Sequence, residues 1–398
     1  MRSGHTLTAI ATATLLTLGS ALLPARMQAR QAATPGVTPT SILVGDSLPQ
    51  SGPAAAYSVI AGGEQAYFSY VNAHGGIFGR KLTLTALDDG YDPTRSLSNV
   101  KNLVLSKGVF ALLGDLGTAN NLATLSFITQ QKVPLVYPAT GSSLMFKPFQ
   151  KYLFPLQLNY TTEGKILADY AVKQLHARKI GVFYQNDDFG KEGLDAVTAQ
   201  AAKDGAAVTD SESYQLTDTD LSPQALKLQQ AGVDAVIIYA VPGPFATFVG
   251  TAAKVGLKAT LLSSSVGADN RLIASMGPVI NGVYFSGYAP PVTGPDPQAV
   301  FMRSVLKQYG DPKTAPVDSF TEAGFGAAQV FVEGLRRAGP NLTRAGFIKA
   351  LETIRNYNGS LYGHVTYTPT SHEGVRGGYI ALVRKNAEVV VTGYQSPK

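Results

Sequence analysis

The sequence predicts an α/β fold of two similar lobes with parallel sheets, and two observations lead to this prediction. Short apolar runs of strand length alternate with segments of helical length, which is typical of parallel sheets covered on both faces. Two stretches far apart in the chain also repeat one order of strand, small-residue loop, helix and strand. The chain has 398 residues, of which 45% are hydrophobic, so it can fill more than one core.

The first 29 residues have the pattern of a cleaved signal peptide. Arg2 and His5 precede an uncharged run from Thr6 to Ala25, and small residues stand near Ala29, where a peptidase could cut. A membrane anchor is the alternative, but the run is barely long enough to cross a bilayer. Because the chain has no cysteine, it offers no thiol for lipid attachment. We therefore expect a free protein of the periplasm.

Strands and helices alternate after a Thr- and Pro-rich linker at 30–39. The first half contains the predicted strands "SILVGDSL", "LTLTALDD", "VFALLGD" and "PLVYPAT", with helical patterns from Gly62 to Asn72, from Pro93 to Ser106 and up to Gln131. The second half contains "KIGVFYQNDD", "AVTDSESYQL", "DAVIIYAVPG", "ATLLSSSVG" and "VYFSGYA". The repeated stretches are 110–137 and 235–263, and they predict equivalent parts of the two lobes.

Composition and motifs argue against catalytic and nucleic-acid functions. The net charge is +6, or about +4 without Arg2 and Arg26 of the first 29 residues, and the basic residues are scattered rather than gathered in a stripe. No GxSxG, Walker A or HExxH motif occurs, and "GFGAAQ" at Gly324 lies within a helical pattern, which indicates close helix packing. We therefore expect no enzyme activity, no cofactor and no nucleic-acid partner.

The ionisable residues show no arrangement typical of a metal site. The acidic pairs Asp88–Asp89 and Asp187–Asp188 each close a strand before a helix, where carboxylates cap free amide groups; contact with a ligand is the second interpretation. The histidines of the mature chain share no ligand spacing, which favours surface or loop positions for His74, His176, His364 and His372. We expect no metal.

Two loops that follow strands give the strongest indication of a binding site. They are "GDLGTANN" and "YPATGSS". In an open parallel sheet, ligands bind beyond the carboxyl ends of the strands, where helix N-termini direct free N–H groups outward. Thr118, Thr140 and Ser142 could add hydroxyl groups to these amides. The loops therefore predict a site for a small anion, above all a carboxylate; tight turns with ordinary Thr and Ser caps are the alternative.

The chain resembles the type I periplasmic-binding proteins of ABC transporters, in the branched-chain amino acid-binding (Leu/Ile/Val-binding) family. The likeness rests on "SGPAAAY" at 51–57, "VNAHGGIFGRKLTLTALDD" at 71–89, "DPTRSLSNVKNLV" at 92–104, "KVPLVYPATGSS" at 132–143 and "YQNDDFGKEGL" at 184–194. It implies two Rossmann-like lobes joined by a three-crossing hinge. Lobe 1 is expected at 40–158 plus about 289–364, and lobe 2 at 159–288 plus about 365–398.

The resemblance also implies which residues contact a solute between the lobes. The positions expected to hold its carboxylate match Thr118, Ala139, Thr140 and Gly141. Tyr57 matches an aromatic ring at the cleft mouth, and Phe189 matches a ring from the second lobe.

Departures from the family pattern concern the amine end of the solute. Amino acid-binding members carry an acid in the loop where this chain has Ser264, and an aromatic-rich turn where it has Val241. Glu322 or the pair Asp187–Asp188 could replace the missing acid. Many relatives also have a disulfide between two cysteines at positions that match Tyr91 and Gly117. This chain has neither of these cysteines.

These features predict a periplasmic receptor that delivers a small carboxylate-bearing solute to an ABC permease and its ATPase. Because a buried ammonium without an acid is costly, aromatic or short aliphatic acids are favoured over amino acids. Amino acid uptake and a ligand-sensing receptor domain are the alternatives. We expect a monomer that acts by binding alone.

Overall fold

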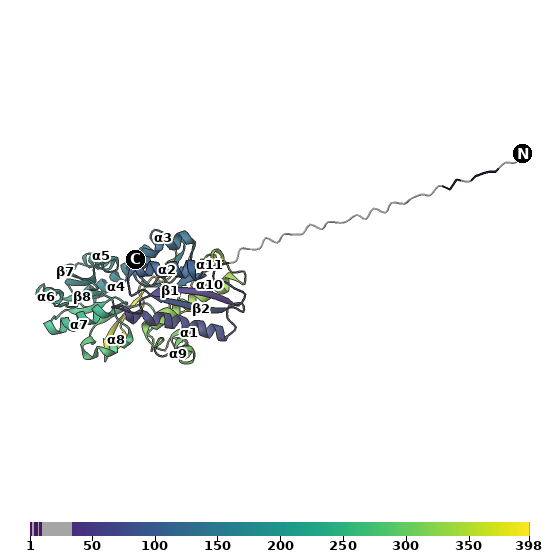
Figure 1. Cartoon of the computed structure of the whole chain (residues 1–398). Helices are drawn as coiled ribbons and strands as arrows, with labels where there is room; N and C mark the ends of the chain where they lie inside the picture. The colour runs from purple at the N-terminus through teal and green to yellow at the C-terminus, as the bar shows by residue number, and fades with distance from the viewer. Residues whose placement is uncertain (2–3, 7, 10–33, 398) are drawn as a thin grey trace. The chain divides into compact units, whose positions relative to one another are not determined.

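The computed structural model describes residues 1, 4–6, 8–9 and 34–397. The chain separates into two units, Met1–Ala33 and Thr34–Lys398, and the second contains all the helices and strands described below. Apart from residues 1, 4–6 and 8–9, the predicted signal peptide lies outside the described residues, as does its cleavage point. Figure 1 shows how the elements of the second unit follow one another along the chain.

The first sheet has five parallel strands in the order β2-β1-β3-β4-β5. Every strand expected in the first half is present, and β1 pairs with β2 over its whole length. The strands are β1 (Ser41–Leu48), β2 (Lys81–Asp88), β3 (Ala111–Leu113), β4 (Leu135–Val136) and β5 (Leu153–Phe154).

The second sheet has seven strands in the order β12-β11-β10-β9-β8-β6-β7. Strands β6 to β10 are parallel, whereas β11 and β12 form an antiparallel hairpin that the sequence analysis did not anticipate. Lys385 and Asn386, which join β11 to β12, both have positive φ, as a two-residue hairpin turn requires. The strands are β6 (Lys179–Gln185), β7 (Ala207–Tyr214), β8 (Ala235–Tyr239), β9 (Thr260–Ser263), β10 (Tyr284–Gly287), β11 (Tyr379–Arg384) and β12 (Ala387–Val390).

We call each sheet with its helices a lobe. The helices of the first lobe are α1 (Val59–Ala73), α2 (Pro93–Lys101), α3 (Thr118–Gln131), α9 (Pro297–Tyr309), α10 (Ser319–Ala338) and α11 (Arg344–Leu351). Those of the second lobe are α4 (Tyr160–Lys173), α5 (Asp188–Lys203), α6 (Ser222–Gln230), α7 (Pro242–Val255) and α8 (Asn270–Ser275). The chain passes between the sheets three times, after β5, after β10 and before β11, which is the connectivity that the family resemblance implies (Figure 1).

Helices α1 and α10 pack closely through glycines. A Cβ atom on Gly324 would lie 2.0 Å from the carbonyl oxygen of Ile60, and one on Gly63 would lie 2.1 Å from that of Thr321. No larger residue fits at either contact without moving the backbone. The interpretation of "GFGAAQ" as a closely packed helix face is therefore confirmed.

Candidate functional site

A cavity of roughly 770 Å³, part of it open to solvent, lies between the two lobes. Its walls come from the segments that follow β1, β2, β3 and β4 in the first sheet, and β6, β8, β9 and β10 in the second. Ligands of open parallel sheets bind beyond the carboxyl ends of strands, which is where this cavity lies. This cavity is the candidate binding site.

Aromatic side chains make up much of the cavity wall. Tyr57 lies against Phe320 with 4.6 Å between ring centroids, and Tyr160 lies against Phe189 with 4.9 Å. The seven lining tyrosines are Tyr57, Tyr91, Tyr137, Tyr160, Tyr288, Tyr362 and Tyr379. Such walls favour a ligand with an apolar or aromatic body.

Half of the residues predicted for the site line this cavity. Tyr57, Ala139, Phe189 and Val241 are among its lining residues. Of the lining residues at 34–397, none is Thr118, Thr140, Gly141 or Ser264. Thr118, Thr140 and Ser264 are each next to a lining residue in the chain, and Gly141 lies against the ring of the lining residue Tyr160.

The first turn of α3 opens on the cavity without a side-chain cap. Gly117 is its N-cap, with φ of 105° and ψ of 143°, and both Gly117 and Leu116 line the cavity. The first N–H groups of a helix have no partner within the helix, and they carry the positive end of its dipole. Because no side chain in the described part of the chain caps this turn, it can receive an anionic group of a ligand.

The hydroxyl groups expected to assist this turn have other partners. Thr118 Oγ1 and Thr140 Oγ1 lie 2.6 Å apart and bond to each other, and both residues are buried. Ser142 Oγ donates to Glu192 Oε2 of α5 at 2.9 Å, across the two lobes. All three side chains thus have hydrogen-bond partners within the protein, and their contact with a ligand stays a prediction.

Ser264 is held by a glutamate that the sequence analysis did not consider. Glu163 of α4 accepts hydrogen bonds from Ser264 Oγ at 2.8 Å, from Ser265 N at 2.9 Å and from Ser286 Oγ at 2.6 Å. Burial raises the pKa of Glu163, and the bonds from the serines oppose this rise. Glu163 thus supports the loop from behind and does not line the cavity, while Ser265 and Val266 form part of the cavity wall.

The acidic pairs have the structural roles expected first. Asp187 caps α5 through Gly190 N at 3.2 Å and accepts from Gln185 Nε2 at 2.6 Å. Asp89 accepts from Tyr91 N at 2.8 Å in the turn after β2. Glu322, in contrast to Asp89 and Asp187, lines the cavity, and it is buried.

Tyr91 and Gly117, the positions that match the family's disulfide, lie against each other. A Cβ atom on Gly117 would lie 2.8 Å from Cε2 of Tyr91. The ring of Tyr91 therefore occupies the space beside the α3 turn, where it also lines the cavity.

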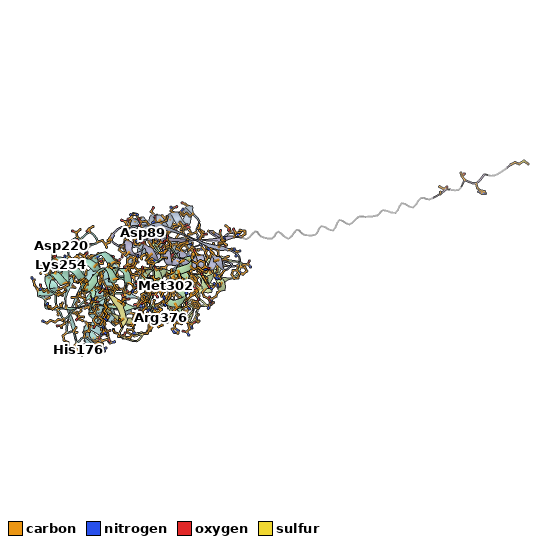
Figure 2. All side chains as sticks on the ribbon, turned by 90° about the horizontal axis from the view of Figure 1, so that it is seen from below. Asp89, His176, Asp220, Lys254, Met302 and Arg376 are labelled. Atoms are coloured by element: carbon orange, nitrogen blue, oxygen red, sulfur yellow. The ribbon has the colours of Figure 1, made fainter. Side chains whose placement is uncertain are left out.

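The histidines give no indication of a metal site. No group of three or more His, Asp or Glu residues within the described residues could hold a metal ion. His74, His176 and His364 are exposed, and Figure 2 labels His176 at the outer edge of the second lobe. His372 is the exception to the expected surface positions, because it is buried and stacks on Phe154 at 4.0 Å between ring centroids. Burial lowers the pKa of His372.

Direct contacts join the lobes around the cavity. Tyr57 donates its hydroxyl to the carbonyl oxygen of Val266 at 2.6 Å, from the first lobe to the second. Arg271 of α8 contacts Asp318, the N-cap of α10, with 2.7 Å between Nε and Oδ2. These contacts hold the lobes together over the site.

No helix found in the described residues is both long and apolar enough to span a membrane.

Comparisons with known proteins agree with this architecture. The chain is 25% identical to the Leu/Ile/Val-binding protein homolog 3 of Brucella melitensis over 331 residues, 83% of this chain and 88% of that protein. The fatty acid ABC transporter substrate-binding protein from Thermomonospora curvata has a TM-score of 0.83 at 24% identity, over 92% of this chain and 95% of that chain. A substrate-binding periplasmic protein from Ralstonia solanacearum has a TM-score of 0.81 at 28% identity, over 88% and 100% of the two chains.

A family model described as periplasmic binding protein matches residues 41–388, which include the first sheet, the second sheet up to Glu388 in β12, and the whole cavity wall. The chain therefore belongs to the periplasmic binding protein family.

Proposed function

We propose that this protein is the solute receptor of an ABC importer and that it binds a small carboxylate-bearing compound with an aromatic or short aliphatic body. As a member of a solute-binding family, the chain binds its solute without transforming it. The observation that carries the proposal is the uncapped first turn of α3, which meets an aromatic cavity between the lobes.

The cavity wall offers backbone amides, and no basic side chain, to a carboxylate. No lysine, arginine or histidine stands among the lining residues at 34–397. A carboxylate in this cavity therefore depends on N–H groups and the helix dipole for its stabilisation. The rings of Tyr57 and Phe189 contact the apolar body, which supplies affinity through buried surface.

The mechanism is a difference in ligand affinity between open and closed lobes. A solute that contacts both lobes favours the closed form, because only that form makes all of the contacts. The permease then recognises the closed receptor, which we expect to be a monomer in the periplasm after removal of residues 1–29.

Amino acid binding is the second candidate. The relative from Brucella melitensis is named for leucine, isoleucine and valine, whereas that from Thermomonospora curvata is named for fatty acids. Both kinds of solute have a carboxylate, but only the amino acids also have an amine. The loop Ser264–Val266 has no acidic side chain that could pair with an ammonium group of the solute. This favours carboxylate solutes that carry no amine facing this loop.

A thermal-shift screen of residues 30–398 tests the function. The panel pairs each acid with its primary amide: benzoate with benzamide, 4-methylpentanoate with its amide, and leucine with leucinamide. We expect at least one acid to raise the melting temperature while its amide does not, because ligand that binds only the folded state stabilises it. Stabilisation by amides alone would contradict a carboxylate site.

A further inference from the structure

Glu322 is the one carboxyl group among the residues that line the cavity within 34–397. It lies in the first turn of α10, and only 4% of its surface is exposed. Its Oε1 atom has no hydrogen-bond partner among the described residues. Buried polar atoms nearly always have a partner, so an unpartnered oxygen on the wall of a binding cavity points to a group on the ligand.

The surroundings of Glu322 offer no other partner. The charged groups that act on it are Glu388, Asp296 and Asp318, all acidic, and they add to the effect of burial in raising its pKa. Asp318 is engaged by the first turn of α10 and by Arg271. Oε1 of Glu322 therefore has no donor among the described residues, and a donor on a solute in the cavity would satisfy it.

The backbone that carries Glu322 is held in place. Its N–H bonds to the carbonyl oxygen of Asp318 at 2.9 Å, and Tyr362 donates its hydroxyl to the carbonyl oxygen of Ala323 at 2.6 Å. Gly324, which follows Glu322 by two residues in α10, lies against α1 with no room for a side chain. A rigid wall of this kind is suited to positioning a specificity-determining group.

We propose that Glu322 is the second polar anchor of the site and accepts a hydrogen bond from an ammonium or hydroxyl group of the solute. This inference rests on the proposed function, in which the carboxylate of the same solute occupies the α3 turn. It narrows the ligand to a carboxylate that also carries a hydrogen-bond donor, namely an amino acid or a hydroxy acid. Asp187 does not have this role, since its oxygens are bonded to Gly190 and Gln185 and it does not line the cavity.

Calorimetry with two matched series of probes tests the inference. One series is 4-methylpentanoate, 2-hydroxy-4-methylpentanoate and leucine; the other is 3-phenylpropanoate, 3-phenyllactate and phenylalanine. Within a series only the donor changes. For the wild-type protein, a donor-bearing member should bind about tenfold or more tightly than the plain acid, because the plain acid leaves Glu322 unpaired.

Two variants assign this preference to Glu322. Glu322→Leu should reduce the preference for donor-bearing solutes to about onefold, and it should not weaken binding of the plain acid. Glu322→Gln keeps an amide oxygen as acceptor, so it should retain a preference for the hydroxy acid and lose most of that for the amino acid. Glu333→Gln, on the same helix but outside the cavity and paired with Arg337, is the matched control and should behave as wild type.

Each outcome separates this inference from the proposed function. If plain acids bind wild-type protein as tightly as their donor-bearing partners, or if Glu322→Leu keeps the preference, Glu322 is not an anchor although the carboxylate site stands. If none of the six probes binds, the proposed function fails, and the inference fails with it. Unchanged melting temperatures of the variants exclude misfolding as the cause of a lost preference.

Discussion

At the scale of single residues, three buried carboxyl groups behind the cavity wall make stability depend on pH. A Cβ atom on Gly114 would lie 2.4 Å from Glu64 Oε1 and 3.1 Å from Asp46 Oδ2, so these two groups flank one glycine. Burial raises the pKa of both, neighbouring acids add to the rise, and burial raises that of Asp115 to about 8. A carboxyl group with a higher pKa in the folded state takes up a proton on folding. Its contribution to stability is therefore present at acid pH and is lost as the pH rises toward about 8.

Glu64→Gln should weaken this pH dependence, because the amide needs no proton to be neutral. As the pH rises above the ordinary pKa range of a glutamate, the free energy of unfolding of wild-type protein should fall by up to about 1.4 kcal/mol per pH unit more than that of the variant, because burial raises the pKa of Glu64. Urea denaturation at several pH values measures the difference. Glu333→Gln is the control, and equal slopes for Glu64→Gln and wild type would show that Glu64 does not hold a proton.

At the scale of elements, the loop between β9 and α8 depends on helix α4. Glu163 accepts four hydrogen bonds from Ser264, Ser265 and Ser286, and all of these groups are buried or half-buried. Glu163→Ala should lower the free energy of unfolding by about 2–5 kcal/mol, because it leaves several donors unpaired. It should also weaken solute binding, since Ser265 and Val266 line the cavity. Chemical denaturation and calorimetry measure both effects; Glu163→Gln should lose less of each, and an alanine variant as stable as wild type would contradict this role.

At the scale of the whole molecule, contacts between the lobes set how easily the cavity closes. Arg271 of the second lobe pairs with Asp318 of the first, and Ser319 N donates to Asn270 Oδ1 at 3.2 Å beside it. Arg271→Gln should raise the Kd of any ligand that binds wild-type protein by about two- to tenfold, because the closed form alone makes this ion pair.

The matched control for Arg271→Gln is Lys254→Gln, a substitution of a basic residue on the surface of the second lobe (Figure 2). Arg271 does not line the cavity, so a change in affinity reports on closure rather than on direct contact. Calorimetry gives the Kd, and small-angle scattering with and without ligand gives the extent of closure. An unchanged Kd would mean that the ion pair is not broken when the lobes open.

Local patterns in the sequence were sufficient for most of the strands and for the edge of the sheets at which the cavity lies, but not for β5 or the β11–β12 hairpin. The alternation of apolar runs and helical segments is a short-range property, and parallel strands bring the loops that follow them to one edge. The motif "GDLGTANN" therefore indicated the α3 turn correctly, and Tyr57 and Phe189 were placed on the cavity wall. The β11–β12 hairpin was missed because its turn residues, Lys385 and Asn386, are not the Asn-Gly or Asp-Gly pair that marks such turns.

Only the tertiary structure decided where the polar side chains of the loops point. Ser264 bonds to Glu163, and Thr118 bonds to Thr140, and none of these three hydroxyl-bearing residues lines the cavity. Glu322, in contrast, faces the cavity although it lies in a helix more than 200 residues after the α3 turn. The orientation of a side chain depends on partners that are distant in the chain, and no local pattern contains them. The sequence by itself thus determined the fold and the edge of the sheets at which the cavity lies, and tertiary contacts decided which groups line it.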